Sequence, residues 1–156
     1  MHTSGNFASR DYGATLLRAS LGTMWITHAL LKWLVFTLAG AAQYFASVGY
    51  PAFLAYPVVG AELLGGLALI LGIYARQVSL LLVPILAAAT LVHVPNGWVF
   101  TNQGGGWEYP VFLILASVAL WLIGDGAFAL LRSSRFVPGG AREEQAPRVS
   151  GIAAAR

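Results

Sequence analysis

Five ionisable residues lie inside or beside long apolar stretches of this sequence: His28, Lys32, Glu62, His93 and Glu108. An ionisable group in an apolar environment is costly, so it usually has a partner and often belongs to a functional site. His28 and Lys32 are four residues apart, which places them on one face of a helix. Histidine and a buried carboxylate can both exchange protons near neutral pH. The pattern predicts a buried polar site that binds or deprotonates a small molecule, with His28, Lys32 and Glu62 as its catalytic residues.

The expected depths of these residues favour contact between the first and second apolar stretches. Counted from the outer helix ends at the helical rise, His28 lies about 16 Å deep and Glu62 about 15 Å deep. Buried Glu62 therefore has His28 or Lys32 as its natural counter-ion. A Lys–Glu pair of this kind can also be purely structural and fix the register of two helices. The sequence leaves the structural and the catalytic interpretation open.

A long segment rich in Gly, Trp and Asn, about residues 95–106, separates the last two apolar stretches. Its tryptophans suit either anchoring at the membrane interface or packing against a ring-shaped ligand. Glu108 opens the fourth stretch, where a carboxylate also suits the positive end of the helix dipole. The residues predicted to bind ligand here are His93, Asn96, Trp98, Trp107, Glu108 and Tyr109.

Two histidines on different helices are the minimum for a b-type haem. His93 is expected about 11 Å nearer the membrane surface than His28, which disfavours joint ligation. The absence of cysteine excludes iron–sulfur clusters, cysteine-ligated zinc and disulfides. We therefore expect no metal site and disfavour haem.

A second polar group is expected near the opposite, inner face. Arg18 lies near the inner end of the first stretch, Arg76 in the connection after the second, and Asp125 near the end of the fourth. Ion pairs at helix ends commonly lock a bundle, so these three residues are predicted to form structural ion pairs, with Asp125 bound to Arg18 or Arg76.

Composition identifies the elements that must position these side chains. Of the 156 residues, 58% are hydrophobic and only 10% are charged, whereas soluble domains have about 45–50% apolar and about 25% charged residues. The excess falls in four stretches, at about residues 13–39, 52–74, 76–94 and 107–131. At about 1.5 Å per residue, each can cross, or nearly cross, a hydrocarbon core of about 30 Å. The sequence predicts an all-α integral membrane protein, a four-helix bundle whose main partner is the lipid bilayer.

Arginine and lysine predict its orientation. Arg10 and Arg18 precede or begin the first stretch, Arg76 lies in the second connection, and five arginines follow residue 131, whereas the first and third connections have none. Positively charged loops remain cytoplasmic. We expect both ends inside a cytoplasmic (inner) membrane, with residues 1–11 a flexible N-terminus and 132–156 a disordered Arg-rich tail. Tyr44 and Tyr50 would join an aromatic belt at the outer face.

Two further points limit the alternatives. Ala39-Gly40-Ala41 follows an apolar stretch with a basic flank, which is the pattern of a signal peptide with its cleavage site. The stretch is long for a signal peptide and contains His28 and Lys32, so we disfavour cleavage there. The net charge of +3 is concentrated at the chain ends without a basic stripe, which argues against nucleic-acid binding.

Short motifs recur in a fixed order along the apolar part of the chain: Leu17-Arg18, Leu21-Gly22, His28 with Lys32, Gly49-Tyr50-Pro51, Glu62-Leu63-Leu64-Gly65-Gly66, Leu71-Gly72-Ile73-Tyr74-Ala75-Arg76, Pro95-Asn96-Gly97-Trp98, Gly105-Gly106-Trp107-Glu108-Tyr109-Pro110 and Gly124-Asp125-Gly126. This ordered set resembles the DoxX family of small membrane proteins. The resemblance covers about residues 16–131 and leaves out both termini.

The resemblance implies a four-helix membrane protein linked to quinone-dependent oxidoreductases, with quinone as the expected cofactor. The family is named for a subunit of an archaeal thiosulfate:quinone oxidoreductase, and some actinobacterial relatives are associated with oxidative-stress complexes. It implies a membrane subunit that works with a protein partner, or as a homo-oligomer, and it supplies no accepted set of catalytic residues. A non-enzymatic scaffold and a small proton-coupled transporter are the alternative interpretations.

Overall fold

The computed structural model describes residues 7–134, and the expectations for residues 1–6 and 135–156 lie outside this part. The described chain is helical, and within it the β structure is one isolated bridge between Ile73 and Leu131. The prediction of an all-α fold is confirmed. The elements in chain order are α1 (Ser9–Leu30), η1 (Leu31–Val35), α2 (Leu38–Ser47), η2 (Ala52–Leu54), α3 (Ala55–Leu71), α4 (Ala75–Leu81), α5 (Val83–His93), η3 (Val94–Asn96) and α6 (Glu108–Ile123).

Length and composition make this a helical membrane protein. Two helical stretches, Ala52–Leu71 and Ala75–Asn96, are long and apolar enough to cross a membrane. The bent pair Ser9–Val35 and Leu38–Ser47 adds a third if it is one span, and Glu108–Ile123 is a shorter apolar helix. Many large apolar side chains face outward, among them Leu64, Leu81 and Leu91, each more than two-thirds exposed. Such a surface suits lipid and is unfavourable in water.

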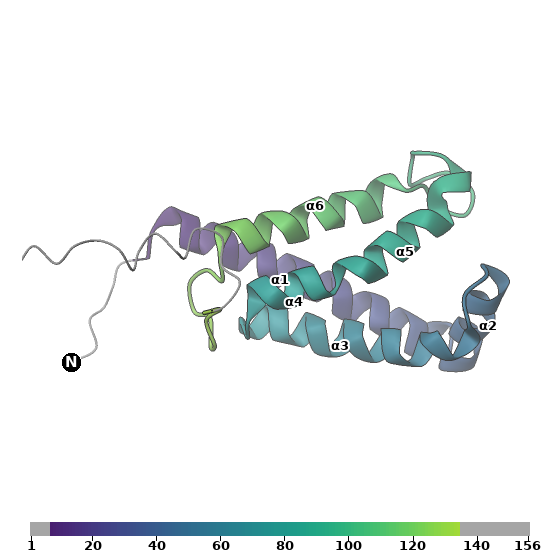
Figure 1. Cartoon of the computed structure of the whole chain (residues 1–156), viewed down its shortest axis with the longest axis horizontal. Helices are drawn as coiled ribbons and strands as arrows, with labels where there is room; N and C mark the ends of the chain where they lie inside the picture. Colours follow the sequence, from purple (N-terminus) through teal and green to yellow (C-terminus); the bar gives the residue numbers. More distant parts are fainter. Residues whose placement is uncertain (1–6, 135–156) are drawn as a thin grey trace, which may run out of the picture.

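Helices α1 and α3 lie against each other along their length (Figure 1). Two glycines make the close approach possible. A Cβ atom on Gly22 would lie 2.6 Å from the carbonyl oxygen of Gly66, and one on Gly66 would lie 2.8 Å from that of Gly22. Small residues commonly allow such backbone contact between membrane helices. This contact fixes Lys32 on the first helix relative to Glu62 on the second.

The first helix continues to Val35 and then bends sharply into α2, at 102°. Thr37 forms the corner with φ at 63°, and its hydroxyl accepts a hydrogen bond from the Gly40 N–H at 3.1 Å. Most of the predicted connection between the first two apolar stretches is therefore helical. The cap satisfies an orphan donor of the new helix, so a short helix forms between the end of η1 and the start of α3.

The third helical stretch is interrupted between α4 and α5. Pro84 lies at the start of α5, and because proline has no N–H it cannot continue the hydrogen-bond ladder of α4. Figure 1 shows α4 beside α3, whereas α5 diverges from α3 toward the far end of the molecule. The divergence separates α5 and α6 from α1 and α3 at that end.

The last helix is shorter than expected from the hydropathy pattern. It ends at Ile123 instead of near residue 131, because Gly124 and Gly126 adopt φ values of 124° and 77°, which favour glycine. The chain then returns to α3 and α4: the Tyr74 N–H donates to Leu131 at 2.9 Å and the Leu131 N–H to Gly72 at 3.1 Å. The apolar residues 127–131 thus extend the fold without extending the helix.

The predicted ion pairs of Asp125 are not present among residues 7–134, where the structure shows one ion pair, between Lys32 and Glu62. Instead, the Asp125 carboxylate accepts the backbone N–H of Arg76 at 3.3 Å and both the N–H and the hydroxyl of Ser133, at 2.8 and 2.7 Å. Because the chain turns at Gly124, the carboxylate faces the start of α4 and the returning segment. The expectation of an Asp125–arginine ion pair is therefore corrected.

Arg18 is almost fully buried, and it binds backbone carbonyls instead of a carboxylate. Its guanidinium donates to Leu69 and Ile70 at 2.9 and 2.6 Å and to Ala127 at 2.9 Å. The first two are carbonyls in the last turn of α3, where carbonyls lack regular intrahelical partners, and that of Leu69 also accepts the Gly72 N–H at 3.2 Å. Arg18 therefore joins α1, α3 and the returning segment. Its role is structural, as predicted, but it acts through hydrogen bonds to backbone carbonyls and not through an ion pair with Asp125.

Candidate functional site

A pocket of about 420 Å³ lies between the α1–α3 pair and the α5–α6 pair, with α2 at one side. This volume is in the usual range for small-molecule sites, about 300–1,000 Å³. Its walls are mostly apolar, and its ionisable or hydroxyl-bearing side chains are His28, Lys32, Tyr44, Tyr50, Glu62, His93 and Tyr109. The bend at Pro84, itself a lining residue, helps to open it. The predicted catalytic residues His28, Lys32 and Glu62 all line this pocket.

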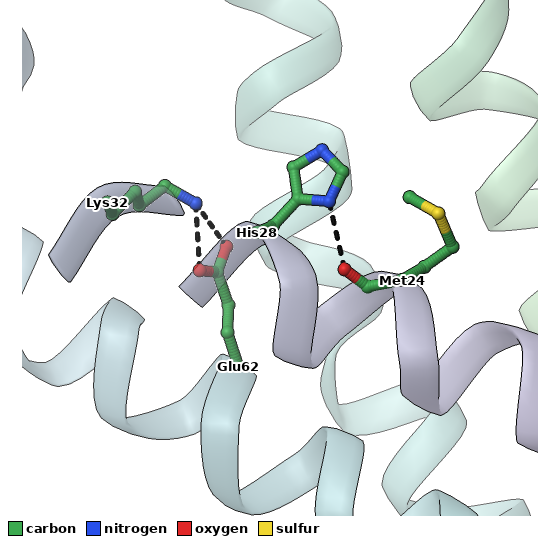
Figure 2. Close-up of polar contacts among 4 residues, drawn as sticks. All are labelled: Met24, His28, Lys32 and Glu62. Atoms are coloured by element: carbon green, nitrogen blue, oxygen red, sulfur yellow. Dashed lines mark hydrogen bonds and ion pairs between the residues drawn. The ribbon is translucent and has the colours of Figure 1, made fainter. Parts of the chain in front are cut away.

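Lys32 and Glu62 form an ion pair across α1 and α3 (Figure 2). The Lys32 Nζ atom lies 2.6 Å from Oε1 and 2.8 Å from Oε2 of Glu62. The Glu62 side chain is 3% exposed and the Lys32 side chain 22% exposed. Lys32 lies in the π-helical turn η1, a local widening that is frequent at functional sites. The ammonium group has three N–H donors, so one remains after Glu62 is satisfied.

His28 does not contact Glu62, although it was the other predicted counter-ion. Its Nδ1 lies 2.9 Å from the carbonyl oxygen of Met24, one turn earlier on α1. Its ring stacks on that of Tyr109, with centroids 6.3 Å apart and planes inclined by 23°. The Tyr109 hydroxyl in turn donates to the Met24 sulfur at 2.8 Å. The imidazole is thus held between α1 and α6, one helical turn from Lys32.

His93 supplies a second imidazole to the same pocket from the end of α5. Its Nδ1 atom is buried and has no hydrogen-bond partner in the described part of the chain. Gly105, in the loop before α6, lies against the ring: a Cβ there would be 3.5 Å from Nδ1. A buried polar atom without a partner is unusual, and here it belongs to a residue that lines a pocket. Since Nδ1 is buried against the loop before α6, another edge of the imidazole lines the pocket.

The structure divides the other predicted ligand-binding residues into two groups. Tyr109 lines the pocket, but the set of lining residues does not include the remaining four, Asn96, Trp98, Trp107 and Glu108. These four organise the loop before α6. Glu108 accepts the Phe100 N–H at 2.8 Å, Asn96 donates to Gly104 at 3.0 Å, and the rings of Trp98 and Trp107 meet edge to face at 4.4 Å. Trp98 and Glu108 also border a separate, shallow groove on the outside of α6.

Several pocket residues were not predicted as such. Tyr44 and Tyr50 were assigned to an interfacial belt, yet both line the pocket, and the Tyr50 hydroxyl approaches the Ala88 carbonyl on α5 at 3.5 Å. Trp25 and Phe45 contribute aromatic wall from α1 and α2. The sequence contained one indication for Tyr50, because this residue lies in the motif Gly49-Tyr50-Pro51. For Tyr44, the direction of α2 decides its position, and that depends on the corner at Thr37.

The fold and this pocket define a class: a helical membrane protein with ionisable side chains in a largely apolar cavity between its helices. The sequence model of the DoxX family matches residues 13–94, and the chain belongs to the DoxX family. This match includes His28, Lys32, Glu62 and His93. The chain is also 33% identical to "Putative oxidoreductase CatD" of Bacillus subtilis (strain 168) over 122 residues, which cover 78% of this chain and 87% of that protein. No solved structure matches the chain significantly.

Proposed function

We propose that this protein is the quinone-binding membrane subunit of an oxidoreductase and that the pocket receives the quinone ring. The observation that carries the proposal is the buried Lys32–Glu62 pair, with His28 and His93 beside it, in an otherwise apolar cavity. The name of the Bacillus relative supports an oxidoreductase role. The family's link to quinone chemistry supports the choice of ligand.

The residues of the pocket fit such a ring. A quinone has two carbonyl oxygens on a flat apolar body, so it needs apolar walls and a few polar partners. The remaining N–H of Lys32 and the imidazole of His93 supply candidate polar partners, while Trp25 and Leu113 belong to the wall. We place the polar end of the ring at Lys32 and His93.

Each side chain has a definite part in this proposal. Lys32 holds positive charge where negative charge develops on a ring oxygen, an effect that is strongest in a dry site. Glu62 orients Lys32, and the two imidazoles exchange protons with the ring oxygens. A bound quinone would supply the ability to carry two electrons together with two protons. The chain has no cysteine for an iron–sulfur cluster, so we assign the supply of electrons to a partner protein.

The test of this function is binding of menadione, a naphthoquinone, to protein purified in mild detergent. Glu62→Gln is expected to weaken binding about tenfold, because Lys32 loses its charged partner and its position. Asp11→Asn is the matched control: it is the same change at an exposed capping carboxylate at the start of α1, and it should leave binding unchanged. Glu62→Gln protein that binds menadione as well as the parent would return the ion pair to a structural role.

We further propose four membrane crossings with both ends on the cytoplasmic side of the inner membrane. The absence of cysteine allows single-cysteine reporters. Gln103→Cys, in the exposed loop before α6, is expected to react in whole cells with a maleimide that cannot cross membranes. Arg132→Cys, exposed after the returning segment, should react only after the membrane is opened. Equal labelling of the two variants in intact cells would contradict this orientation.

A further inference from the structure

The hydrogen bond of His28 determines which of its ring nitrogens carries a proton. Nδ1 lies 2.9 Å from the Met24 carbonyl oxygen, and a carbonyl oxygen can only accept a hydrogen bond. Nδ1 must therefore be the donor. In the neutral imidazole, which has one proton, Nε2 is then the unprotonated nitrogen and an acceptor.

This acceptor has no hydrogen-bond partner in the part of the chain that the structure describes. Figure 2 shows Nε2 on the side of the ring opposite the Met24 contact, pointing away from the α1 ribbon and from Glu62. No hydrogen bond to Nε2 is present within residues 7–134, and His28 lines the pocket. The stacked Tyr109 ring limits rotation of the imidazole, since its hydroxyl is held by Met24. The pocket thus contains a fixed, open hydrogen-bond acceptor.

We infer that the pocket selects ring compounds that carry a hydroxyl group, with this hydroxyl donating to Nε2 of His28. This inference rests on the proposed function and makes it more specific: the ligand class is the hydroxylated, reduced form of a quinone, or a phenol of similar shape. A quinone has only acceptor oxygens, so it gains nothing from an acceptor at Nε2. Lys32, one turn further along the same helix face, suits an acceptor oxygen elsewhere on the ring.

Three ligands of similar size separate this inference from the proposed function: menadione, the corresponding methylated naphthol, and the methyl ether of that naphthol. Binding is measured by equilibrium dialysis at about pH 8, with micelles without protein as the blank. The naphthol is expected to bind about fivefold more tightly than its ether, since one net hydrogen bond is lost with the hydroxyl proton. Equal affinity of naphthol and ether, with menadione bound, overturns the inference and leaves the proposed function standing. Failure of all three ligands to bind overturns both.

Two variants locate the effect at His28. His28→Phe keeps an aromatic ring beside Tyr109 but removes the acceptor. This variant should therefore bind the naphthol and its ether with equal affinity. Thr27→Val is the control, because Thr27 is the exposed neighbour on α1 and is absent from the pocket lining. It should retain the fivefold difference. A difference that persists in His28→Phe protein overturns the assignment to Nε2.

A measurement on the unmodified chain does not depend on the folding of any variant. The protein has three histidines, so nitrogen-15 labelling of histidine gives few imidazole signals. At about pH 8 the His28 ring should show a protonated Nδ1 and an unprotonated Nε2, and addition of the naphthol should shift the Nε2 signal. Protonation at Nε2, or an Nε2 signal that does not respond to the naphthol, contradicts the inference.

Discussion

Lys32→Met is expected to lower the free energy of unfolding by about 3 kcal/mol, because Glu62 would stay buried without its counter-ion. The Glu62 side chain is 3% exposed, and Lys32 is the one cation in contact with it among residues 7–134. Unfolding can be followed by circular dichroism as the denaturing detergent fraction is raised. Arg10→Met is the control, since it removes one positive charge from an exposed position on α1 and should have little effect.

A double variant separates the structural part of the ion pair from its part in binding. Lys32→Met with Glu62→Leu leaves no buried charge, and apolar replacements of buried ion pairs are often neutral or stabilising. We expect the double variant to regain most of the stability lost in Lys32→Met and still to bind menadione poorly. If the double variant binds menadione like the parent, the pair is only a link between helices. If Lys32→Met is as stable as the parent, the ion pair does not contribute to the free energy of unfolding, contrary to what its burial indicates.

The second large effect is expected at the contact between α1 and α3. Gly66→Ala should cost about 2–3 kcal/mol, because its Cβ would lie 2.8 Å from the carbonyl oxygen of Gly22, a backbone atom that cannot rotate away. The two helices would have to separate along their whole contact. Lys32 and Glu62 would then move apart, so the variant should also bind menadione less tightly.

Gly60→Ala is the matched control on the same helix. A Cβ at Gly60 meets no atom within 4 Å, and alanine is the better helix former by up to about 1 kcal/mol. This variant should therefore be neutral or slightly stabilised in the same detergent titration. Equal destabilisation of Gly60→Ala and Gly66→Ala would show that the loss comes from glycine in α3 generally. The close approach to Gly22 would then not be its cause.

Much of the fold could be predicted because it depends on local properties of the chain. In lipid the backbone must satisfy its own hydrogen bonds, so long apolar stretches become helices wherever they occur. The pairing of Glu62 with either His28 or Lys32 followed from the same regularity, because a constant rise per residue converts sequence position into depth. His28 was placed correctly beside this pair on its helix face, although its hydrogen bond goes to its own helix.

Tertiary structure decided the features that depend on distant parts of the chain. Hydropathy could not show that α6 ends at Ile123, because the apolar residues after it return to Gly72 and Tyr74, which are nearly sixty residues earlier. That return also gives Asp125 its contacts with Ser133 and the Arg76 backbone in place of an ion pair.

The composition of the pocket depends both on local properties of the sequence and on the tertiary structure. The sequence by itself determined a helical membrane protein in which buried Glu62 pairs with His28 or Lys32, since spacing and cost of burial are local quantities. Only the tertiary structure decided that Lys32 is the partner, that Tyr44 and Tyr50 line the pocket, and that Trp98 and Glu108 belong to the loop. The physical reason is that the corner at Thr37 and the bend at Pro84 set the directions of α2 and α5, and these directions determine which side chains enclose the cavity.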